Sequence, residues 1–337
     1  MAHLEMLLQK GPPDGDHLAG LEELRRIILL DGIPANNDGM SELRIYVWLI
    51  LLNAPPTKTD DYQNRVLIGA SPAYEKIRND TFRTLTTDPL FRRRVTENSL
   101  TRVLNAVSWK LHEANEARAN GWKSPPTLAA PQSLDGNEDM FHSPTSRAGH
   151  GSVAGTEISE TGGDASGAVS YVQGMNVLAA PFLYAARSEA QAFTAFDAFI
   201  TKEVPGYVRA SMEGVHKGLA LVDQILEIVD PKLAAHLASK GMKAEIYAFP
   251  SVLTLCACTP PLPDVLQLWD FLFAYGPHLN LLCIVSQLVL IRDLLLNSPT
   301  PKPDFKPLRA RKVIDYTVNF ARKIPADLYE QMLVHAK

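Results

Sequence analysis

The sequence predicts an all-α protein. Nearly every segment with large apolar residues repeats them at helical spacing, and strand-like alternation bounded by hairpin turns is absent. Hydrophobic residues make up 46% and charged residues 21% of the 337 residues, a balance typical of soluble globular proteins. A chain of this length can build one large helical core.

The first predicted helix carries a stripe of Leu21, Leu24 and Ile28. Gly32 follows the last turn, where glycine commonly ends a helix. Residues 1–20 lie before this stripe, and we expect them to form a flexible N-terminus.

Caps or apolar spacing predict three of the further helices before residue 115. Ser41 can cap a helix that carries Leu43, Val47 and Ile50. The pair "DP" at 88–89 places an N-cap aspartate before a proline at the first helical position. The strongest helix signal has apolar residues at i, i+3, i+4, i+7 and i+11 across 100–111.

Residues from about 115 to 168 break the helical pattern. They consist largely of Pro, Gly, Ser, Thr and Ala, with few large apolar side chains. Such a segment cannot bury enough surface to offset the entropy lost on ordering. Because helical text resumes at once, we predict a disordered insertion within one domain over residues 21–276.

Helical spacing continues to the end of the chain. One stripe runs across 215–229, "DP" at 230–231 starts another helix, and Pro263 opens a third. Residues 277–337 are predicted as C-terminal helices packed on the domain. Their apolar content suggests a hydrophobic groove for a second protein along 278–297 and 311–336.

Composition disfavours several functional classes. A net charge of −4 and a pI near 6.1 disfavour nucleic-acid binding. The most apolar late stretch, "LNLLCIVSQLVLIRDLLL", contains Arg292 and Asp293, so we expect a core helix rather than a membrane span. The three cysteines form no disulfide framework and no secretory signal is visible, so a cytoplasmic protein is expected.

Sequence motifs for an independent active site are missing. The chain lacks a phosphate-binding G-x-x-x-x-G-K-[ST] loop, an H-E-x-x-H metal motif and a G-x-S-x-G nucleophile motif. Its nine histidines are scattered and have no neighbours at metal-ligand spacing. We therefore expect no cofactor and no metal site in this chain.

Two short stretches carry a different signal. In "IRNDTFRT", Asp80 and Arg83 lie three apart on a predicted helix, within reach of each other. The second stretch, "YVQGMN", begins at Tyr171, where ordered sequence resumes. Together they resemble the I-x-x-D-x-x-R and Y-x-Q-G-M-N motifs of the TBC domain, the helical fold of GTPase-activating proteins for Rab-like small GTPases.

Two landmarks extend this resemblance from about Gly32 to Gly276. "GIP" at 32–34 is followed by an R-x-x-x-W pair, and "LQLWDFLFAYG" occupies 266–276. The chain departs from the family pattern at Val172, where many relatives have cysteine, and in its longer insertion.

The resemblance implies a division of roles among the motif residues. Arg83 and Gln173 would be the catalytic residues, acting on GTP and Mg²⁺ held by a partner GTPase. The supporting residues would be Asp80, Tyr171, Gly174 and Asn176. Asp80 would hold Arg83 in position when no partner is bound.

The longer sequence stretches around both motifs are similar to those of a fungal TBC subgroup. That subgroup acts in the spindle-pole checkpoint and restrains the mitotic-exit or septation-initiation network. This likeness implies a Rab-like substrate GTPase, a larger scaffold subunit as partner, and a location in the cytoplasm at the spindle pole body. Three alternatives remain open: a GAP for vesicle-traffic Rabs, a catalytically silent TBC scaffold, and a general helical adaptor.

Overall fold

The computed structural model describes residues 2–12, 15–86, 88–121 and 169–337, and all regular elements in these ranges are helical. The all-α prediction is confirmed. The N-terminal half contains α1 (Ala2–Lys10), α2 (His17–Leu30), α3 (Arg44–Leu51), α4 (Thr59–Ile68), α5 (Tyr74–Thr81), α6 (Pro89–Arg94), α7 (Glu97–Ala119), α8 (Met175–Ala185) and α9 (Glu189–Ala198).

The C-terminal half follows a π-helical turn, η2 (Phe199–Glu203), and a 3₁₀ turn, η3 (Pro205–Tyr207). Its elements are α10 (Glu213–Val229), α11 (Pro231–Ser239), α12 (Ala244–Tyr247), α13 (Phe249–Leu253), α14 (Leu262–Tyr275), η4 (Pro277–Leu279), α15 (Asn280–Leu290), α16 (Arg292–Leu296), α17 (Ala310–Ala321) and α18 (Ala326–Val334).

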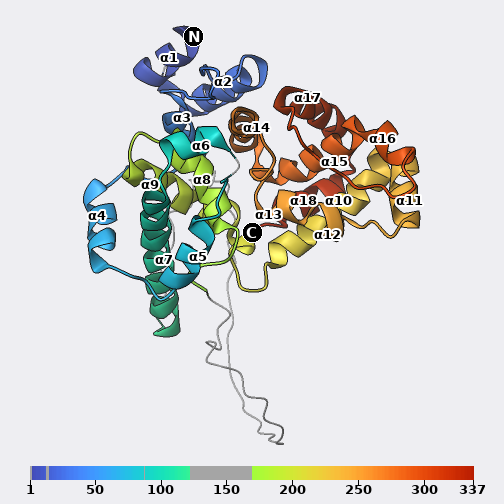
Figure 1. Ribbon diagram of the computed structural model, residues 1–337. Coiled ribbons are helices and arrows are strands. Elements are labelled where there is room, and N and C mark those ends of the chain that lie inside the picture. The colour runs from blue at the N-terminus through green and yellow to red at the C-terminus, as the bar shows by residue number, and fades with distance from the viewer. Residues whose placement is uncertain (1, 13–14, 87, 122–168) are drawn as a thin grey trace, which may run out of the picture.

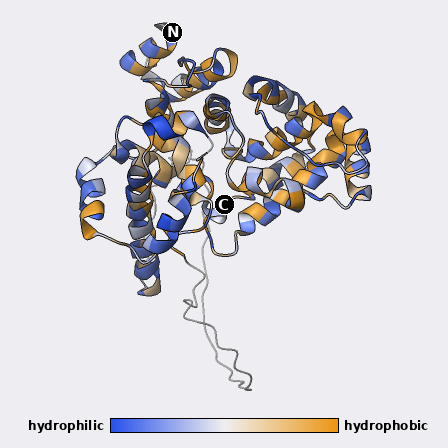
Figure 2. Cartoon of the chain, in the orientation of Figure 1, coloured by the Kyte–Doolittle hydropathy of each residue, from blue (hydrophilic) through white to orange (hydrophobic). Residues whose placement is uncertain are grey.

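The two halves gather on either side of α14 (Figure 1). Helix α14 packs against α3 and α8 on one side and against α17 on the other. One continuous hydrophobic core spans both halves. Hydrophobic and hydrophilic residues share the same helices, as expected where each helix buries one face (Figure 2).

Two predicted boundaries differ from the structure. Residues 2–10 form α1, in which Leu4 is buried against α2, so the prediction of a flexible segment there is wrong. Leu4, Leu7 and Leu8 stand at i, i+3 and i+4, the spacing of one short helical stripe. Helix α7 extends to Ala119, so residues 115–119 are not part of the insertion. Residues 122–168 lie outside the described residues.

Helix α15 is a central element of the C-terminal half. Every residue from Asn280 to Leu288 is buried, against α10, α13 and α17. The predicted apolar groove along 278–297 is therefore wrong for this helix, because its hydrophobic surface faces the core. The exposed large apolar side chains in this region are spread over three helices: Leu294, Tyr316, and the neighbours Leu333 and Val334.

A buried ion pair joins the N-terminal half to α14. The Arg44 guanidinium donates to both carboxylate oxygens of Asp270, with Nε 2.9 Å from Oδ1 and Nη2 3.0 Å from Oδ2. Trp48 Nε1 donates to Oδ1 of the same carboxylate at 2.8 Å. Burial raises the pKa of the Asp270 carboxyl, and the two donors oppose that rise. The family landmarks R-x-x-x-W and W-D are thus one buried joint.

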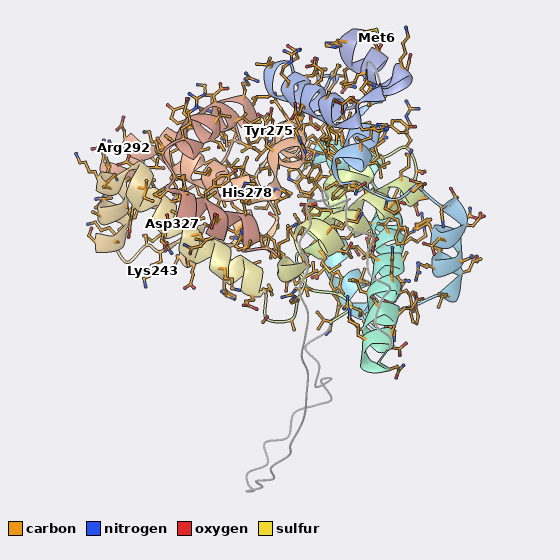
Figure 3. The ribbon with its side chains drawn as sticks, turned by 180° about the vertical axis from the view of Figure 1, so that it is seen from behind. Met6, Lys243, Tyr275, His278, Arg292 and Asp327 are labelled. Atoms are coloured by element: carbon orange, nitrogen blue, oxygen red, sulfur yellow. The ribbon has the colours of Figure 1, made fainter. Side chains whose placement is uncertain are left out.

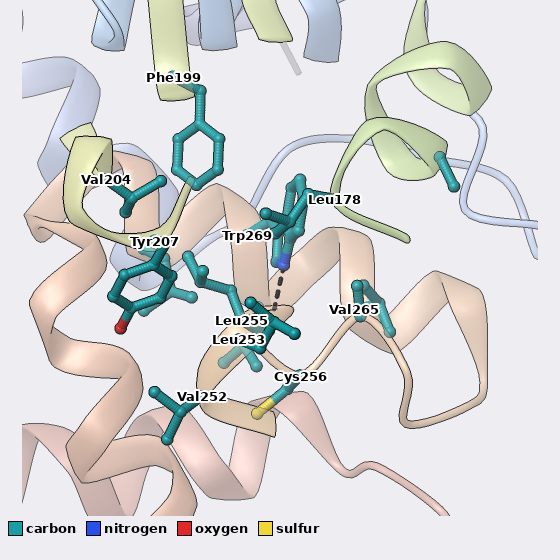
Figure 4. Packing of buried hydrophobic residues seen from close by; sticks show 14 of the residues in the cluster. Leu178, Phe199, Val204, Tyr207, Val252, Leu253, Leu255, Cys256, Val265 and Trp269 are labelled. Atoms are coloured by element: carbon teal, nitrogen blue, oxygen red, sulfur yellow. Dashed lines mark hydrogen bonds between the residues drawn. The ribbon is translucent and has the colours of Figure 1, made fainter. Parts of the chain in front are cut away.

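An aromatic cluster surrounds this joint. Trp48, Phe182 and Trp269 pack with ring centroids 5.3 to 5.9 Å apart. Trp269 Nε1 also donates to the carbonyl oxygen of Leu255 at 2.9 Å (Figure 4). This bond fixes the turn that follows α13, and α13 carries Leu253. Phe182 lies in α8, the helix that begins in the second motif "YVQGMN". The aromatic cluster and the turn after α13, the helix that carries Leu253, therefore both lie next to this motif.

Two buried histidines lie near the C-terminus. His278 Nε2 is 3.0 Å from the Tyr329 hydroxyl; Figure 3 shows His278 close to Tyr275. His335 donates from Nδ1 to the Met332 carbonyl at 2.6 Å, which leaves Nε2 to accept from the Tyr207 hydroxyl at 2.8 Å. Burial lowers the pKa of both histidines, that of His278 to about 4.

Because both histidines are buried with a lowered pKa, we expect the free energy of unfolding to fall at acidic pH. The stability that His278 contributes is complete above pH 6.5, where it is neutral in both states, and falls as pH drops toward 4, because only the unfolded chain takes up the proton. The loss for His278 alone is about 3 kcal/mol at most. Denaturant unfolding between pH 7.5 and 4.5 should therefore show a weaker pH dependence for His278→Gln. The exposed His216→Gln serves as control, and equal slopes for all three proteins would contradict the prediction.

Candidate functional site

Arg83 lies just beyond the end of α5. That helix ends at Thr81 with Phe82 as its C-cap, so the prediction that Asp80 and Arg83 share a helix is wrong for Arg83. The predicted pairing is nevertheless present, because Arg83 Nη2 donates to Asp80 Oδ1. The Arg83 side chain is 55% exposed, whereas that of Asp80 is 9% exposed. The charged group therefore reaches solvent from a buried anchor.

The second motif spans the start of its helix. Tyr171 and Val172 are buried, Gln173 is exposed, and α8 begins at Met175. Gly174 is the N-cap with φ +105°, a conformation that L side chains rarely adopt. A Cβ on Gly174 would lie 2.7 Å from Leu253 Cδ2, so close approach to α13 also requires glycine here.

A buried hydrogen-bond network connects the two motifs. The Tyr171 hydroxyl donates to Asp80 Oδ2 at 2.9 Å. Asn176 Oδ1 accepts from the Gly174 backbone N–H at 3.1 Å, and its Nδ2 donates to Thr84 Oγ1 at 2.8 Å. The four residues predicted as supporting are therefore brought together. Arg83 and Gln173 are the exposed side chains attached to this network.

The charges of the network are arranged around one carboxylate. One oxygen of Asp80 accepts from Tyr171 and the other accepts from Arg83. Burial, and then the neighbouring Asp80, raise the pKa of the Tyr171 hydroxyl above its usual range, so it stays protonated and keeps donating. Asp80 thus retains one buried donor when Arg83 turns toward another molecule.

The side chains of Arg83 and Gln173 are exposed, so both can reach another molecule. A guanidinium can stabilise developing negative charge, and an amide can donate and accept hydrogen bonds simultaneously. No cluster of three potential metal ligands occurs among the residues that the structure describes. Within the same residues, no helix is long and apolar enough to cross a membrane. An apolar cavity of about 610 Å³ between α1, α2 and α3 includes no network residue.

Sequence reasoning missed two residues of the site. Thr84 bonds to both motifs, and its only sequence signal is a hydroxyl four residues after Asp80, the spacing for bonding back to a helix carbonyl. Leu253 packs against Gly174 from α13, and nothing in the sequence near it indicates that contact.

Comparisons with known proteins agree with this fold. The family model described as "Rab-GTPase-TBC domain" matches residues 165–296, which include Gln173 but not Arg83. "Cell division control protein 16" of Schizosaccharomyces pombe is 38% identical over 99% of this chain and 93% of its own length. "Mitotic check point protein BUB2" of Saccharomyces cerevisiae is 34% identical over 94% of this chain and 92% of its own length.

Solved structures provide a separate comparison. The flagellar RabGAP TBC domain of Chlamydomonas superimposes with a TM-score of 0.63 at 17% identity, covering 96% of this chain and 91% of that structure. At this identity the likeness concerns the fold alone. It extends over both halves of the molecule.

Proposed function

The chain belongs to the Rab-GTPase-TBC domain family, and on that premise we propose that it is a GTPase-activating protein for a Rab-like small GTPase. It would supply Arg83 and Gln173 in trans to a nucleotide held by that partner. The observation that carries this proposal is the buried network that holds the exposed Arg83 beside the segment of the exposed Gln173.

The arginine supplies charge to the transition state. Small GTPases hydrolyse GTP slowly because charge developing on the β- and γ-phosphate oxygens is poorly compensated, and an arginine in trans is worth about 10³–10⁵ in rate. A guanidinium is permanently charged and can fork onto two phosphate oxygens. Asp80 holds Arg83 in the free protein, so the side chain is positioned before the partner arrives.

The glutamine acts on the same reaction from a neighbouring position. Its amide would orient the attacking water or hold aside the glutamine of the GTPase, because it donates and accepts hydrogen bonds at once. The buried Tyr171 and the cap at Gly174 fix the backbone on either side of Gln173. GTP and Mg²⁺ would both be held by the partner, and this chain would contribute only protein groups.

The relatives favour a role in cell division. The names of the two fungal relatives refer to cell division control and to a mitotic check point, and the similarity covers nearly the whole of each chain. We therefore place the substrate among the Rab-like GTPases of the mitotic-exit or septation-initiation network, and the chain in the cytoplasm at the spindle pole body. We further propose a larger scaffold subunit as partner, because the two catalytic side chains accelerate hydrolysis only if the GTPase is gripped in the right pose.

Single-turnover GTP hydrolysis tests this proposal. We expect weak acceleration by the isolated chain and a sharp rise when the scaffold is added to chain and GTPase. Mitotic-network GTPases and vesicle-traffic Rabs should be compared in the same series. Greater acceleration of the vesicle-traffic Rabs would show that the substrate is a GTPase of vesicle traffic. Full activity from the chain alone, unchanged by scaffold, would contradict the two-component arrangement, and tight binding without acceleration would indicate a silent scaffold.

A further inference from the structure

Thr84 occupies the contact between the two motifs. It follows Arg83 directly, lies in the turn after α5, and is 5% exposed. Its Oγ1 is 2.9 Å from the Asp80 carbonyl oxygen and 2.8 Å from Asn176 Nδ2. The two partners lie 96 residues apart in the sequence.

The direction of each hydrogen bond in this contact is fixed. The Gly174 backbone N–H can only donate, so the atom of Asn176 that it contacts at 3.1 Å must be the amide oxygen. The NH₂ group of Asn176 therefore faces Thr84 and donates to Oγ1. The Asp80 carbonyl can only accept, so the Thr84 hydroxyl gives its proton there. The shortest bonds run from the Gly174 N–H through Asn176 and Thr84 to the last turn of α5, beside a longer direct bond of 3.5 Å from Asn176 Nδ2 to the Asp80 carbonyl.

The turn that carries Arg83 depends on this chain. Residues 82–86 follow the last helical turn of α5, and Leu85 adopts φ +46°, a strained conformation for a leucine. Thr84 N bonds to the Thr81 carbonyl at 3.1 Å, and the Thr84 hydroxyl occupies the next carbonyl back. Among the described residues, the bond from Asn176 Nδ2 to this hydroxyl is the side-chain bond that ties residues 82–86 to the second motif.

We propose that Thr84 is a positioning residue that sets Arg83 relative to Gln173 for GTP hydrolysis. The proposal rests on the function proposed above and adds a residue to it. Thr84 does not touch the partner, because it is buried. Its hydrogen bonds connect the backbone of Arg83 to the peptide unit between Gln173 and Gly174. They thereby hold the two segments in a fixed relative position. Cooperative bonding makes the chain depend on its central hydroxyl.

Thr84→Val tests this with little change of shape. The valine removes the hydroxyl, and we expect the single-turnover rate at saturating chain and scaffold to fall about 10- to 100-fold, the effect of a displacement near 1 Å. The chain concentration that gives half of the maximal rate should change little. Thr84→Ser keeps the hydroxyl and should restore the rate to within about threefold of the original chain.

Thr81→Val is the matched control. Thr81 is also buried, and its hydroxyl bonds to the Arg78 carbonyl at 3.2 Å and to Thr101 Oγ1 at 3.1 Å, without contact to the second motif. Both valine variants should lose a similar amount of thermal stability, but only Thr84→Val should lose rate. Amide exchange at Gly174 should quicken in Thr84→Val and not in Thr81→Val. An equal loss of rate in the two variants would make Thr84 merely structural.

The Arg83→Ala background separates the proposed role of Thr84 from the proposed function. In Arg83→Ala, Thr84→Val should cause no further loss of rate, because Thr84 acts through Arg83. A full additional loss there would overturn the positioning role, as would unchanged Gly174 exchange in Thr84→Val. Full activity of Arg83→Ala by itself would instead refute the proposed mechanism, a result visible without any Thr84 variant.

Discussion

Replacing Arg83 with alanine is expected to slow GTP hydrolysis by the partner about 10³- to 10⁵-fold, which corresponds to roughly 4–7 kcal/mol of lost transition-state stabilisation. The reason is that alanine leaves the charge developing on the phosphate oxygens without its guanidinium. Thermal stability should hardly change, because the Arg83 side chain is 55% exposed and such ion pairs contribute little. Single-turnover hydrolysis and a separate GTPase-binding assay measure the two effects.

Two further variants sharpen this result. Arg83→Lys should fail nearly as badly as alanine, because an ammonium cannot fork onto two oxygens. Gln173→Ala should also slow hydrolysis, and its effect should be strongly non-additive with that of Arg83→Ala, since both act on one transition state. A double variant that loses the simple product of the two single effects would show that the residues do not share a site.

Replacing Arg44 with methionine should lower the free energy of unfolding by about 3–5 kcal/mol, the loss found when one partner of a buried ion pair is removed. Methionine cannot donate a hydrogen bond to the buried Asp270 carboxylate. Of the two present donors, only the Trp48 indole N–H would remain. Both side chains of the pair are at most 3% exposed, so water cannot replace the guanidinium. Denaturant unfolding at neutral pH measures the loss.

Lys217→Met is the control for this prediction. Lys217 pairs with Glu213 one turn away at 2.6 Å, and both side chains are more than half exposed. Removing such an exposed pair should hardly change the free energy of unfolding. If Arg44→Met were no more harmful than this control, the joint at α14 would not be a principal support of the fold.

The fold class could be predicted from the sequence because helical spacing is a local property. The stripe across 100–111 and the caps at 88–89 and 230–231 required only near neighbours, and they lie in helices. Two predictions about packing failed. Leu4 of α1 is buried against α2, and α15 is enclosed by helices from three separate parts of the chain.

The candidate site was predictable in part, for a different reason. Family motifs identified Asp80, Arg83, Tyr171 and Asn176, and the structure brings them together. That Arg83 lies beyond α5 could not be predicted, because a spacing of three residues suits a helix and the turn after it equally well. Thr84 was missed because a buried hydroxyl has no sequence signature until its distant partner is known.

The separation of the two motifs in the chain has a consequence for biosynthesis. Asp80 and Tyr171 bond across 91 residues, so a ribosome completes Arg83 well before it makes the donors that fix Asp80 and Thr84. Contacts between such distant residues form late in folding. A nascent chain that has emerged only through α7 therefore carries the arginine without its support. Competence to act on a GTPase should arise only after the second motif has been translated and docked, so interrupted synthesis would leave inactive fragments.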